Sequence, residues 1–308
     1  MPRTDVSFRS GSDTCAAWLY RPDGVVVEGA AAAGESRPII VMAHGLACVR
    51  EMRLDAFADR FTAAGYLCLV FDYRYFGAST GEPCQLLDIR SQREDWRAAV
   101  VYARSVAGAD PGRVILWGSS FSGGHVFAVG ADDPRLAAVI AQCPFTSGLA
   151  STLAVPPMTL LKLSALGVAD CVGSWIGRNP LMVESNGTPG SVALMTSEDS
   201  KSGMDALMPD GSTIRTDVAA RFALDIVRSF PGRSAERIRC PLFVVVCEND
   251  TVAPAGPTKR YVAAANGEMR VTKAGHFDIY VGEEFERNVA EQLDFLARTV
   301  PTPENRAS

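Results

Sequence analysis

Histidine is scarce in this sequence, and its cysteines lack the spacing of a metal or redox motif. Only three histidines occur in 308 residues, and the eight cysteines include no Cys-x-x-Cys pair. Zinc sites draw their ligands mainly from these two residue types, so we expect no metal and no cofactor. Several cysteines, such as Cys68, lie in apolar runs, which is typical of buried free thiols in a reducing compartment.

The sequence also lacks a long apolar run, an apolar stretch behind its amino-terminal charges, and an excess of positive charge. Its most membrane-like segment, residues 152–177, is interrupted by Lys162, Asp170 and two prolines, so we expect no membrane span. No signal peptide is visible, which predicts a cytoplasmic protein. The formal net charge of -5 gives no electrostatic reason to expect nucleic acid as a partner. The sequence allows a homodimer as well as a monomer.

Apolar runs and amphipathic segments alternate along most of the chain. A hairpin is predicted over residues 6–10 and 15–20, and residues 24–36, rich in small side chains, are predicted to form a loop. The apolar runs typical of buried strands occupy residues 38–43, 66–72, 113–117, 136–143 and 241–247, and a further strand is predicted over residues 268–273. Helical spacing occurs over residues 53–64, 87–106, 121–130, 257–265 and 283–299. The alternation predicts an α/β fold with a mostly parallel, eight-stranded sheet and helices on both faces.

The alternation stops near Pro144 and returns near Pro241, between the sixth and seventh predicted strands. No clear strand is evident between these points, and glycine, proline and serine are frequent. We therefore expect a core formed by residues 1–145 and 239–308, with an inserted, mainly helical cap over residues 146–238. Apolar cap residues are candidates for contact with substrate, although packing of the cap onto the core explains them equally well. They include Met158, Leu161 and Trp175.

A predicted strand ends at Gly118, and a helix begins almost at once after it. The residue at the apex of so tight a turn has strained dihedral angles, so its neighbours must be small. Ser120 stands at this apex, two residues after Gly118 and two before Ser122, and is the predicted nucleophile. The motif Gly-x-Ser-x-Ser departs from Gly-x-Ser-x-Gly at Ser122, a second candidate that the spacing disfavours.

A nucleophilic serine needs a base, and the base needs a carboxylate to orient it. His276 follows the last predicted strand, where a loop can reach the carboxyl edge of the sheet, so it is the predicted base. Asp250 lies just past the strand over residues 241–247 and is the predicted acid, with Glu248 as its rival. Asp72 ends another strand and is expected to cap a turn.

The oxyanion that forms during acyl transfer needs hydrogen-bond donors. The backbone N–H of Phe121, next after the nucleophile, is one predicted donor, and that of Leu46, after the third strand, is the other. Gly45 is expected to let the backbone turn its amides toward the site. His44 is expected to brace this loop, and His125, inside a helix, to be a structural histidine.

These motifs resemble the α/β-hydrolase superfamily over nearly the whole chain outside the predicted cap. The matching positions are residues 44–45, 118–125, 250 and 276–278. Residues 51–53, 72–77 and 275–280 resemble, more narrowly, bacterial dienelactone-hydrolase-like and Xaa-Pro-peptidase-like hydrolases and fungal polyketide transferases. The resemblance implies ester, thioester or lactone chemistry on a small molecule, without identifying the substrate.

Several functions remain open at this point. The first is a serine hydrolase that forms an acyl-enzyme on Ser120. The second is an acyltransferase with the same three residues, in which an alcohol or amine replaces water. A third is a non-catalytic ligand-binding protein on a hydrolase frame; such a protein usually lacks a catalytic residue, whereas Ser120, Asp250 and His276 are all present. A proline-specific peptidase normally adds a second domain that selects peptides, and no such region is evident.

Overall fold

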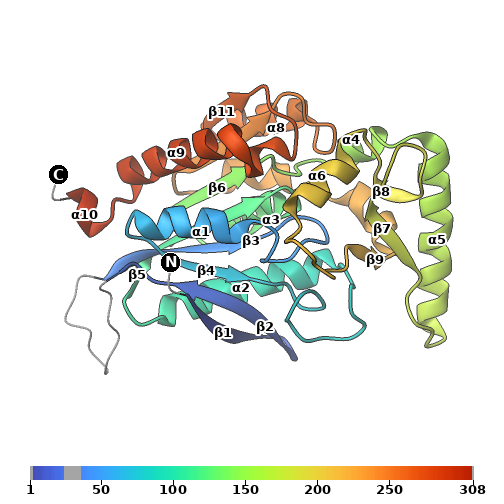
Figure 1. Cartoon of the computed structure of the whole chain (residues 1–308), viewed down its shortest axis with the longest axis horizontal. Coiled ribbons are helices and arrows are strands. Elements are labelled where there is room, and N and C mark those ends of the chain that lie inside the picture. Colours follow the sequence, from blue (N-terminus) through green and yellow to red (C-terminus); the bar gives the residue numbers. More distant parts are fainter. Residues whose placement is uncertain (1–2, 24–35, 307–308) are drawn as a thin grey trace.

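An eight-stranded sheet organises the computed structural model, which describes residues 3–23 and 36–306 (Figure 1). The strand order is β1-β2-β4-β3-β5-β6-β10-β11; β1, β2 and β4 pair antiparallel, and all pairs from β4 onward are parallel. The strands are β1 (Arg3–Ser10), β2 (Asp13–Tyr20), β3 (Arg37–Ala43), β4 (Leu67–Phe71), β5 (Ala109–Ser119), β6 (Ala138–Gln142), β10 (Leu242–Cys247) and β11 (Glu268–Thr272). The predicted mostly parallel sheet is confirmed. A loop was predicted over residues 24–36. All of these residues except Ser36 lie outside the described part of the chain.

Helices cover both faces of this sheet. Helices α1 (Leu54–Ala63) and α9 (Gly282–Thr299) contact each other on one face. Helices α2 (Ile89–Ser105) and α3 (Phe121–Asp132) pack together on the other, and α8 (Ala255–Ala264) also contacts β10. As a result β4, β6 and β10 are buried at every position, which is why they read as unbroken apolar runs in the sequence. Among the helices described, none is long and apolar enough to cross a bilayer.

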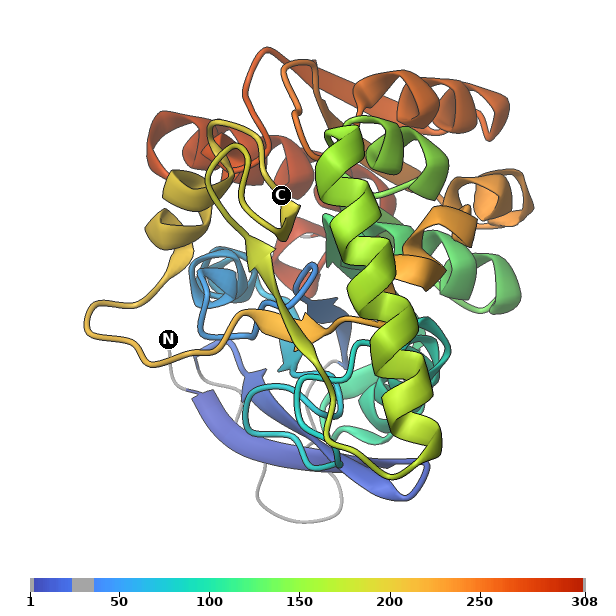
Figure 2. The ribbon, with the colours of Figure 1, turned by 90° about the vertical axis from the view of Figure 1, so that its right-hand side faces the viewer.

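Residues 146–238, which we call the inserted segment, lie between β6 and β10, the sixth and seventh strands of the sheet in chain order. Its helices are α4 (Gly148–Leu153), α5 (Pro157–Trp175), α6 (Ser200–Leu207), α7 (Phe222–Asp225) and the 3-10 helices η1 (Ile226–Arg228) and η2 (Pro231–Arg237). Figure 1 places α5 and α6 beyond the end of the sheet to which the arrows of β3 and β6 point. In Figure 2, which faces that end, α5 crosses in front of the sheet.

The expectation that this segment contains no strand is wrong. Strands β7 (Met182–Asn186), β8 (Ala193–Met195) and β9 (Asp217–Ala219) form a second sheet in the order β8-β7-β9. They have only three to five residues each, which is too short for a period of two to be recognised in the sequence.

Candidate active site

Ser120, His276 and Asp250 form a continuous chain of hydrogen bonds. Nδ1 of His276 lies 2.7 Å from Oδ2 of Asp250, and Nε2 lies 2.9 Å from Oγ of Ser120. A carboxylate only accepts, so Nδ1–H donates to Asp250, and Nε2 is left to accept from the Ser120 hydroxyl. Oδ1 of Asp250 accepts from the N–H groups of Val252 and Ala253, at 2.8 and 2.6 Å. The structure therefore brings together the three residues predicted as nucleophile, base and acid.

Ser120 occupies the strained turn between β5 and α3. Its φ of 56° and ψ of -119° lie where residues with side chains are rare. Gly118 makes this turn possible, because a Cβ there would lie 2.5 Å from the carbonyl oxygen of Ser122. The hydroxyl of Ser122 is buried and lies 2.8 Å from that of Tyr73, which accepts a hydrogen bond from Nε1 of Trp96 at 2.8 Å. Ser122 is thus held beneath the turn, whereas Ser120 faces the base.

The two rival carboxylates have other partners. Glu248, whose side chain is 43% exposed, accepts from Nζ of Lys259 at 2.7 Å. Asp72 is buried and accepts from the backbone N–H groups of Arg50 and Ala78, at 2.8 and 3.2 Å. Asp72 therefore stabilises a turn, as predicted, and neither carboxylate orients the base.

The other two histidines are buried in structural positions. Nε2–H of His44 donates to the carbonyl of Met52 at 2.7 Å, and Nδ1 accepts from the N–H of Gly45 at 2.7 Å. His125 donates through Nε2 to the side-chain oxygen of Gln92 at 2.8 Å. Burial lowers the pKa of His44 to about 4 and that of His125 to about 3, so both rings are neutral at pH 7. His44 braces the loop after β3.

The predicted oxyanion donors, Leu46 and Phe121, line the same cavity as Ser120. Phe121 is the first residue of α3, and the first N–H groups of a helix have no partner within it. Gly45 is not among the described residues with positive φ. Glycine is needed there because a Cβ would lie 2.8 Å from Cβ of Ser120. That Gly45 turns its amides toward the site stays a prediction. The role of Leu46 and Phe121 as oxyanion donors stays a prediction.

The neighbours of His276 change the pKa of its ring. His276 is buried, and burial alone lowers its pKa; the charge and hydrogen bond of Asp250, together with Cys143, outweigh this effect and raise the pKa of His276 well above 6.5. The ring is therefore a stronger base than an isolated histidine, and its imidazolium form is stabilised by the adjacent carboxylate.

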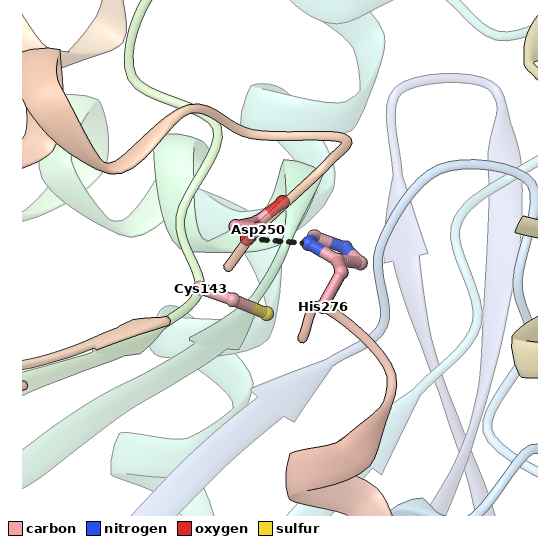
Figure 3. A group of neighbouring side chains, drawn as sticks. All are labelled: Cys143, Asp250 and His276. Carbon is pink, nitrogen blue, oxygen red and sulfur yellow. Dashed lines mark hydrogen bonds and ion pairs between the residues drawn. The ribbon is translucent and has the colours of Figure 1, made fainter. Parts of the chain in front are cut away.

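Cys143 is a neighbour of this pair that the sequence did not indicate (Figure 3). Cys143, Asp250 and His276 each have one atom that could bind a metal ion, and these three atoms lie within 4.8 Å of one another. This is close enough for a shared metal ion. However, both ring nitrogens of His276 and both oxygens of Asp250 already form hydrogen bonds. A metal ion would have to displace these bonds, so the donor set suits the hydrogen-bonded chain better. The proximity of Cys143 depends on β6 lying beside β10, which the sequence alone does not reveal.

A buried polar network lies beneath the turn and was also missed. Ser119 forms hydrogen bonds with the hydroxyl of Tyr280 and with Nε2 of Gln142. The side-chain oxygen of Gln142 accepts from Asn288 at 2.8 Å and from Gln292 at 3.0 Å. The network joins the residue before the nucleophile to α9 and to the 3-10 helix η3 (Asp278–Tyr280), which follows the base.

An apolar cavity of about 160 Å³ adjoins Ser120. The inserted segment supplies much of its lining, including Val155, Leu160, Leu163, Leu194 and Ile226. Because these residues lie next to the nucleophile, the inserted segment determines the shape of the space in which a substrate would bind.

The residues predicted to contact the substrate, Met158, Leu161 and Trp175, lie away from the cavity at Ser120. Their exposed fractions are 62%, 64% and 83%, and none of them lines the cavity. Helix α5 is apolar on most sides, so its composition did not show which side faces inward. The buried side carries Thr159, Leu163, Gly167 and Asp170.

Comparisons with known proteins agree with this fold. The quorum-quenching protein AidA of Acinetobacter baumannii (strain MDR-ZJ06) is 54% identical over 298 residues, 96% of this chain and 95% of that protein. The polyketide transferase ATR5 of Stachybotrys chlorohalonatus is 27% identical over 307 residues, 97% of this chain and 98% of its own. The crystal structure of the α/β hydrolase GrgF from Penicillium sp. sh18 superposes with a TM-score of 0.81 at 24% identity, covering 97% of this chain and 99% of that one.

The family model described as serine aminopeptidase, S33, matches residues 34–275. That range contains β3, the turn at Ser120, the inserted segment and Asp250, and it ends one residue before His276. The match covers most of the chain. The chain belongs to the serine aminopeptidase S33 family of α/β hydrolases.

Proposed function

We propose that this protein is a serine hydrolase that cleaves a carboxylic ester, thioester or lactone through an acyl-enzyme on Ser120. The proposal rests on the hydrogen-bonded chain from Asp250 through His276 to Ser120. A hydroxyl, a buried base and a carboxylate in this order are the parts that nucleophilic acyl transfer needs.

In the first half-reaction, Oγ of Ser120 attacks the acyl carbonyl while its proton moves to Nε2 of His276. The tetrahedral intermediate collapses as the bond to the leaving alcohol or thiol breaks, and His276 returns the proton to that group. Asp250 keeps Nδ1 protonated and stabilises the imidazolium through the 2.7 Å hydrogen bond. Water then attacks the acyl-enzyme by the same route and releases the acid.

The oxyanion of each tetrahedral intermediate would lie between the N–H groups of Phe121 and Leu46. One such donor contributes about 3 kcal/mol to stabilisation of the transition state. The first N–H of α3 is also at the positive end of that helix dipole, which favours the developing negative charge.

The inserted segment, in this proposal, acts as a cap that excludes water and selects the acyl or alcohol group. Its apolar contribution to the cavity favours medium-length or cyclic hydrocarbon groups over acetate. The name of the 54% identical relative, a quorum-quenching protein, extends the proposal to a substrate class. This chain would inactivate a small signal molecule, and opening an ester or lactone bond is the step that its site could supply.

Acyl transfer is a second candidate because ATR5, 27% identical over almost the whole chain, is named a polyketide transferase. The two functions differ only in the second half-reaction, where an alcohol or amine replaces water. Product analysis with an added alcohol separates them: a transferase forms the new ester in preference to the free acid, whereas a hydrolase releases mainly acid.

The test of the proposal compares Ser120→Ala with Ser122→Ala. Ser120→Ala should abolish hydrolysis of p-nitrophenyl butyrate and labelling by a fluorophosphonate, and Ser122→Ala should keep both. Ser122 is the matched control because it lies two residues away and its hydroxyl is hydrogen-bonded to Tyr73. Labelling that survives in Ser120→Ala but disappears in Ser122→Ala would reverse the assignment. A panel of p-nitrophenyl esters, acyl thioesters and lactones, assayed with the wild type, then identifies the substrate class.

A further inference from the structure

A second cavity, of about 660 Å³, lies between the start of α2 and the chain from α7 to η2. It shares no lining residue with the cavity at Ser120. Five arginines line it, together with two aspartates, on a protein whose formal net charge is -5. We call it the arginine cavity after Arg90, Arg93, Arg97, Arg228 and Arg233.

Two of the five arginines are paired with carboxylates, and three are not. Arg90 pairs with Glu94 at 3.2 Å and Arg97 with Asp132 at 2.8 Å. Within residues 3–23 and 36–306, no carboxylate oxygen lies within 4.0 Å of the guanidinium groups of the other three, Arg93, Arg228 and Arg233. The guanidinium group of Arg233 lies over the ring of Phe230, 4.4 Å from its centroid, so the groups of Arg93 and Arg228 are the ones that a ligand would contact first.

Arg93 has a buried donor without a partner. Its Nε is buried and forms no hydrogen bond among the residues that the structure describes. Burial, and then the neighbouring Arg97, lower the pKa of Arg93, which still titrates far above pH 7 as guanidinium groups do. A charged donor that is removed from water without an acceptor destabilises the fold, unless a ligand supplies the acceptor.

The two aspartates offset only part of this charge. Burial raises the pKa of Asp225 and the charge of the neighbouring Arg228 acts in the opposite direction, so Asp225 and Arg228 attract each other. Oδ1 of Asp88 accepts from the N–H of Ser91 at 2.6 Å and caps α2, and Asp225 is exposed at the end of α7. The lining thus carries three more positive than negative charges. Guanidinium groups bind phosphate and carboxylate oxygens through paired hydrogen bonds. The volume lies in the range of roughly 300 to 1,000 Å³ that ligand sites occupy.

We propose that the arginine cavity binds a small phosphate-bearing anion with at least two negative charges, and that its occupancy affects substrate binding at the Ser120 cavity. The two cavities share one wall. Ile226 of η1 lines the Ser120 cavity, whereas Asp225 and Arg228, on either side along the chain, line the arginine cavity. An anion bound by Arg228 would therefore shift the segment that carries Ile226, and with it the lining of the Ser120 cavity.

This wall also supports α4. The N–H of Gly148 donates to the carbonyl of Ser229 at 2.7 Å, and a Cβ on Gly148 would lie 1.8 Å from the carbonyl oxygen of Ile226. Ser151 and Thr152 of α4 line the Ser120 cavity. Because the backbones of α4 and η1 are in close contact at Gly148, a shift of η1 would displace α4 as well.

Binding is tested by isothermal titration calorimetry of the full chain with pyrophosphate at constant ionic strength. The wild type should bind one equivalent, and Arg93→Gln and Arg228→Gln should each weaken binding at least about tenfold, the effect of losing one charge-assisted hydrogen bond. Arg9→Gln, an exposed arginine on β1 outside the lining, is the matched control and should bind as the wild type does.

If Arg93→Gln does not fold, Arg233→Gln, at an exposed position, replaces it. No binding to the wild type, or equal binding to the Arg228→Gln variant, overturns the site.

A second experiment tests the coupling between the two cavities, and it rests on the proposed hydrolase activity. Saturating pyrophosphate should change the KM for p-nitrophenyl butyrate of the wild type by about fivefold, the low end of coupling between sites, and leave the KM of the Arg228→Gln variant unchanged. Arg228 lies outside the Ser120 cavity, so this variant should keep the basal activity. Binding with an unaltered KM overturns the coupling. Because calorimetry needs no turnover, failure of the hydrolase proposal is distinguishable from failure of the anion site.

Discussion

The α-carbon of Gly45 lies against the side chain of Ser120. A Cβ added to Gly45 would come within 2.8 Å of Cβ and 3.1 Å of Oγ of Ser120, and within 3.3 Å of the carbonyl oxygen of Ser119. Real Cβ atoms essentially never show a contact as short as 2.8 Å, so glycine is what allows the loop after β3 to approach Ser120 this closely. The same loop carries Leu46, the second predicted oxyanion donor.

Gly45→Ala should therefore lower kcat/KM for p-nitrophenyl butyrate by about 10² to 10³, the loss expected when one oxyanion donor is withdrawn. The methyl group must push away either Ser120 or the loop that carries Leu46. Gly256→Ala is the control, because a Cβ there meets only the end of an arginine side chain at 3.9 Å. Wild-type kinetics in Gly45→Ala would show that the loop does not have to approach Ser120 so closely.

Asp250→Asn and Glu248→Gln separate the two carboxylates past β10. The first variant should lose about 10² to 10⁴ in kcat, because an amide no longer fixes the tautomer of His276 or stabilises its imidazolium form. The second should stay close to the wild type, since Glu248 pairs with Lys259 at the surface. Steady-state kinetics of both proteins provide the check, and the opposite ranking would transfer the acid role to Glu248.

The pH dependence follows from the raised pKa of His276. Only the neutral ring accepts the proton of Ser120, so kcat/KM should fall as the pH drops through the pKa of the free enzyme. Because Asp250 raises that pKa, the inflection should lie above 6.5, and it should move to lower pH in Asp250→Asn. A pH profile of kcat/KM for both proteins measures this, and a wild-type inflection below 6.5 would mean that burial outweighs the charge of Asp250.

Activity should persist after dialysis against EDTA. The donor atoms of Asp250 and His276 that lie close to Cys143 are already engaged in hydrogen bonds, and the proposed acyl-enzyme mechanism requires no metal. Esterase assays before and after dialysis, with and without added zinc, are the measurement. An enzyme that loses activity in EDTA and regains it with zinc would refute this mechanism.

The sheet, and the proximity of Ser120, Asp250 and His276, could be predicted from the sequence because both depend on local patterns. Buried parallel strands are continuous apolar runs, and the residues at their carboxyl ends must meet at one edge of the sheet whatever the loops do. Ser120 and Asp250 each follow such a run, and His276 follows the exposed edge strand β11, so their convergence at one edge could be inferred from the sequence alone. The departure at Ser122 was also harmless, since its hydroxyl is accommodated beside Tyr73.

What the sequence could not predict depends on which segments lie side by side. Cys143 lies close to His276 only because β6 neighbours β10, and Gly45 approaches Ser120 because β3 neighbours β5. In the inserted segment the strands are too short to show alternation, and α5 is too uniformly apolar to show its inward side. The predicted catalytic residues thus lie together in the structure, and their roles stay predictions, whereas the α5 residues predicted to contact substrate do not line the cavity.

The cavity at Ser120 makes a prediction about chain length that contrasts two leucines of α5. A volume of about 160 Å³ is close to that of cavities that accept benzene, so it suits an acyl group of about four to six carbons. We expect kcat/KM to be higher for butyryl or hexanoyl than for acetyl p-nitrophenyl esters, and to rise on the order of tenfold from acetyl to butyryl, in keeping with the apolar area that its two further methylene groups bury.

Leu163→Ala and Leu161→Ala then test whether this cavity holds the acyl chain. Leu163 is 3% exposed and lines the cavity, whereas Leu161 is 64% exposed and does not. Leu163→Ala should shift the preference toward octanoyl esters and lower the free energy of unfolding by about 2 to 3 kcal/mol, because it enlarges a buried space. Leu161→Ala should change the free energy of unfolding by less than about 0.5 kcal/mol and leave the preference unaltered. The ratio of kcat/KM for octanoyl and butyryl esters is independent of the folded fraction, so it separates the two effects. If Leu163→Ala lowers stability but keeps the wild-type ratio, α5 only packs against the core, and the acyl group binds elsewhere.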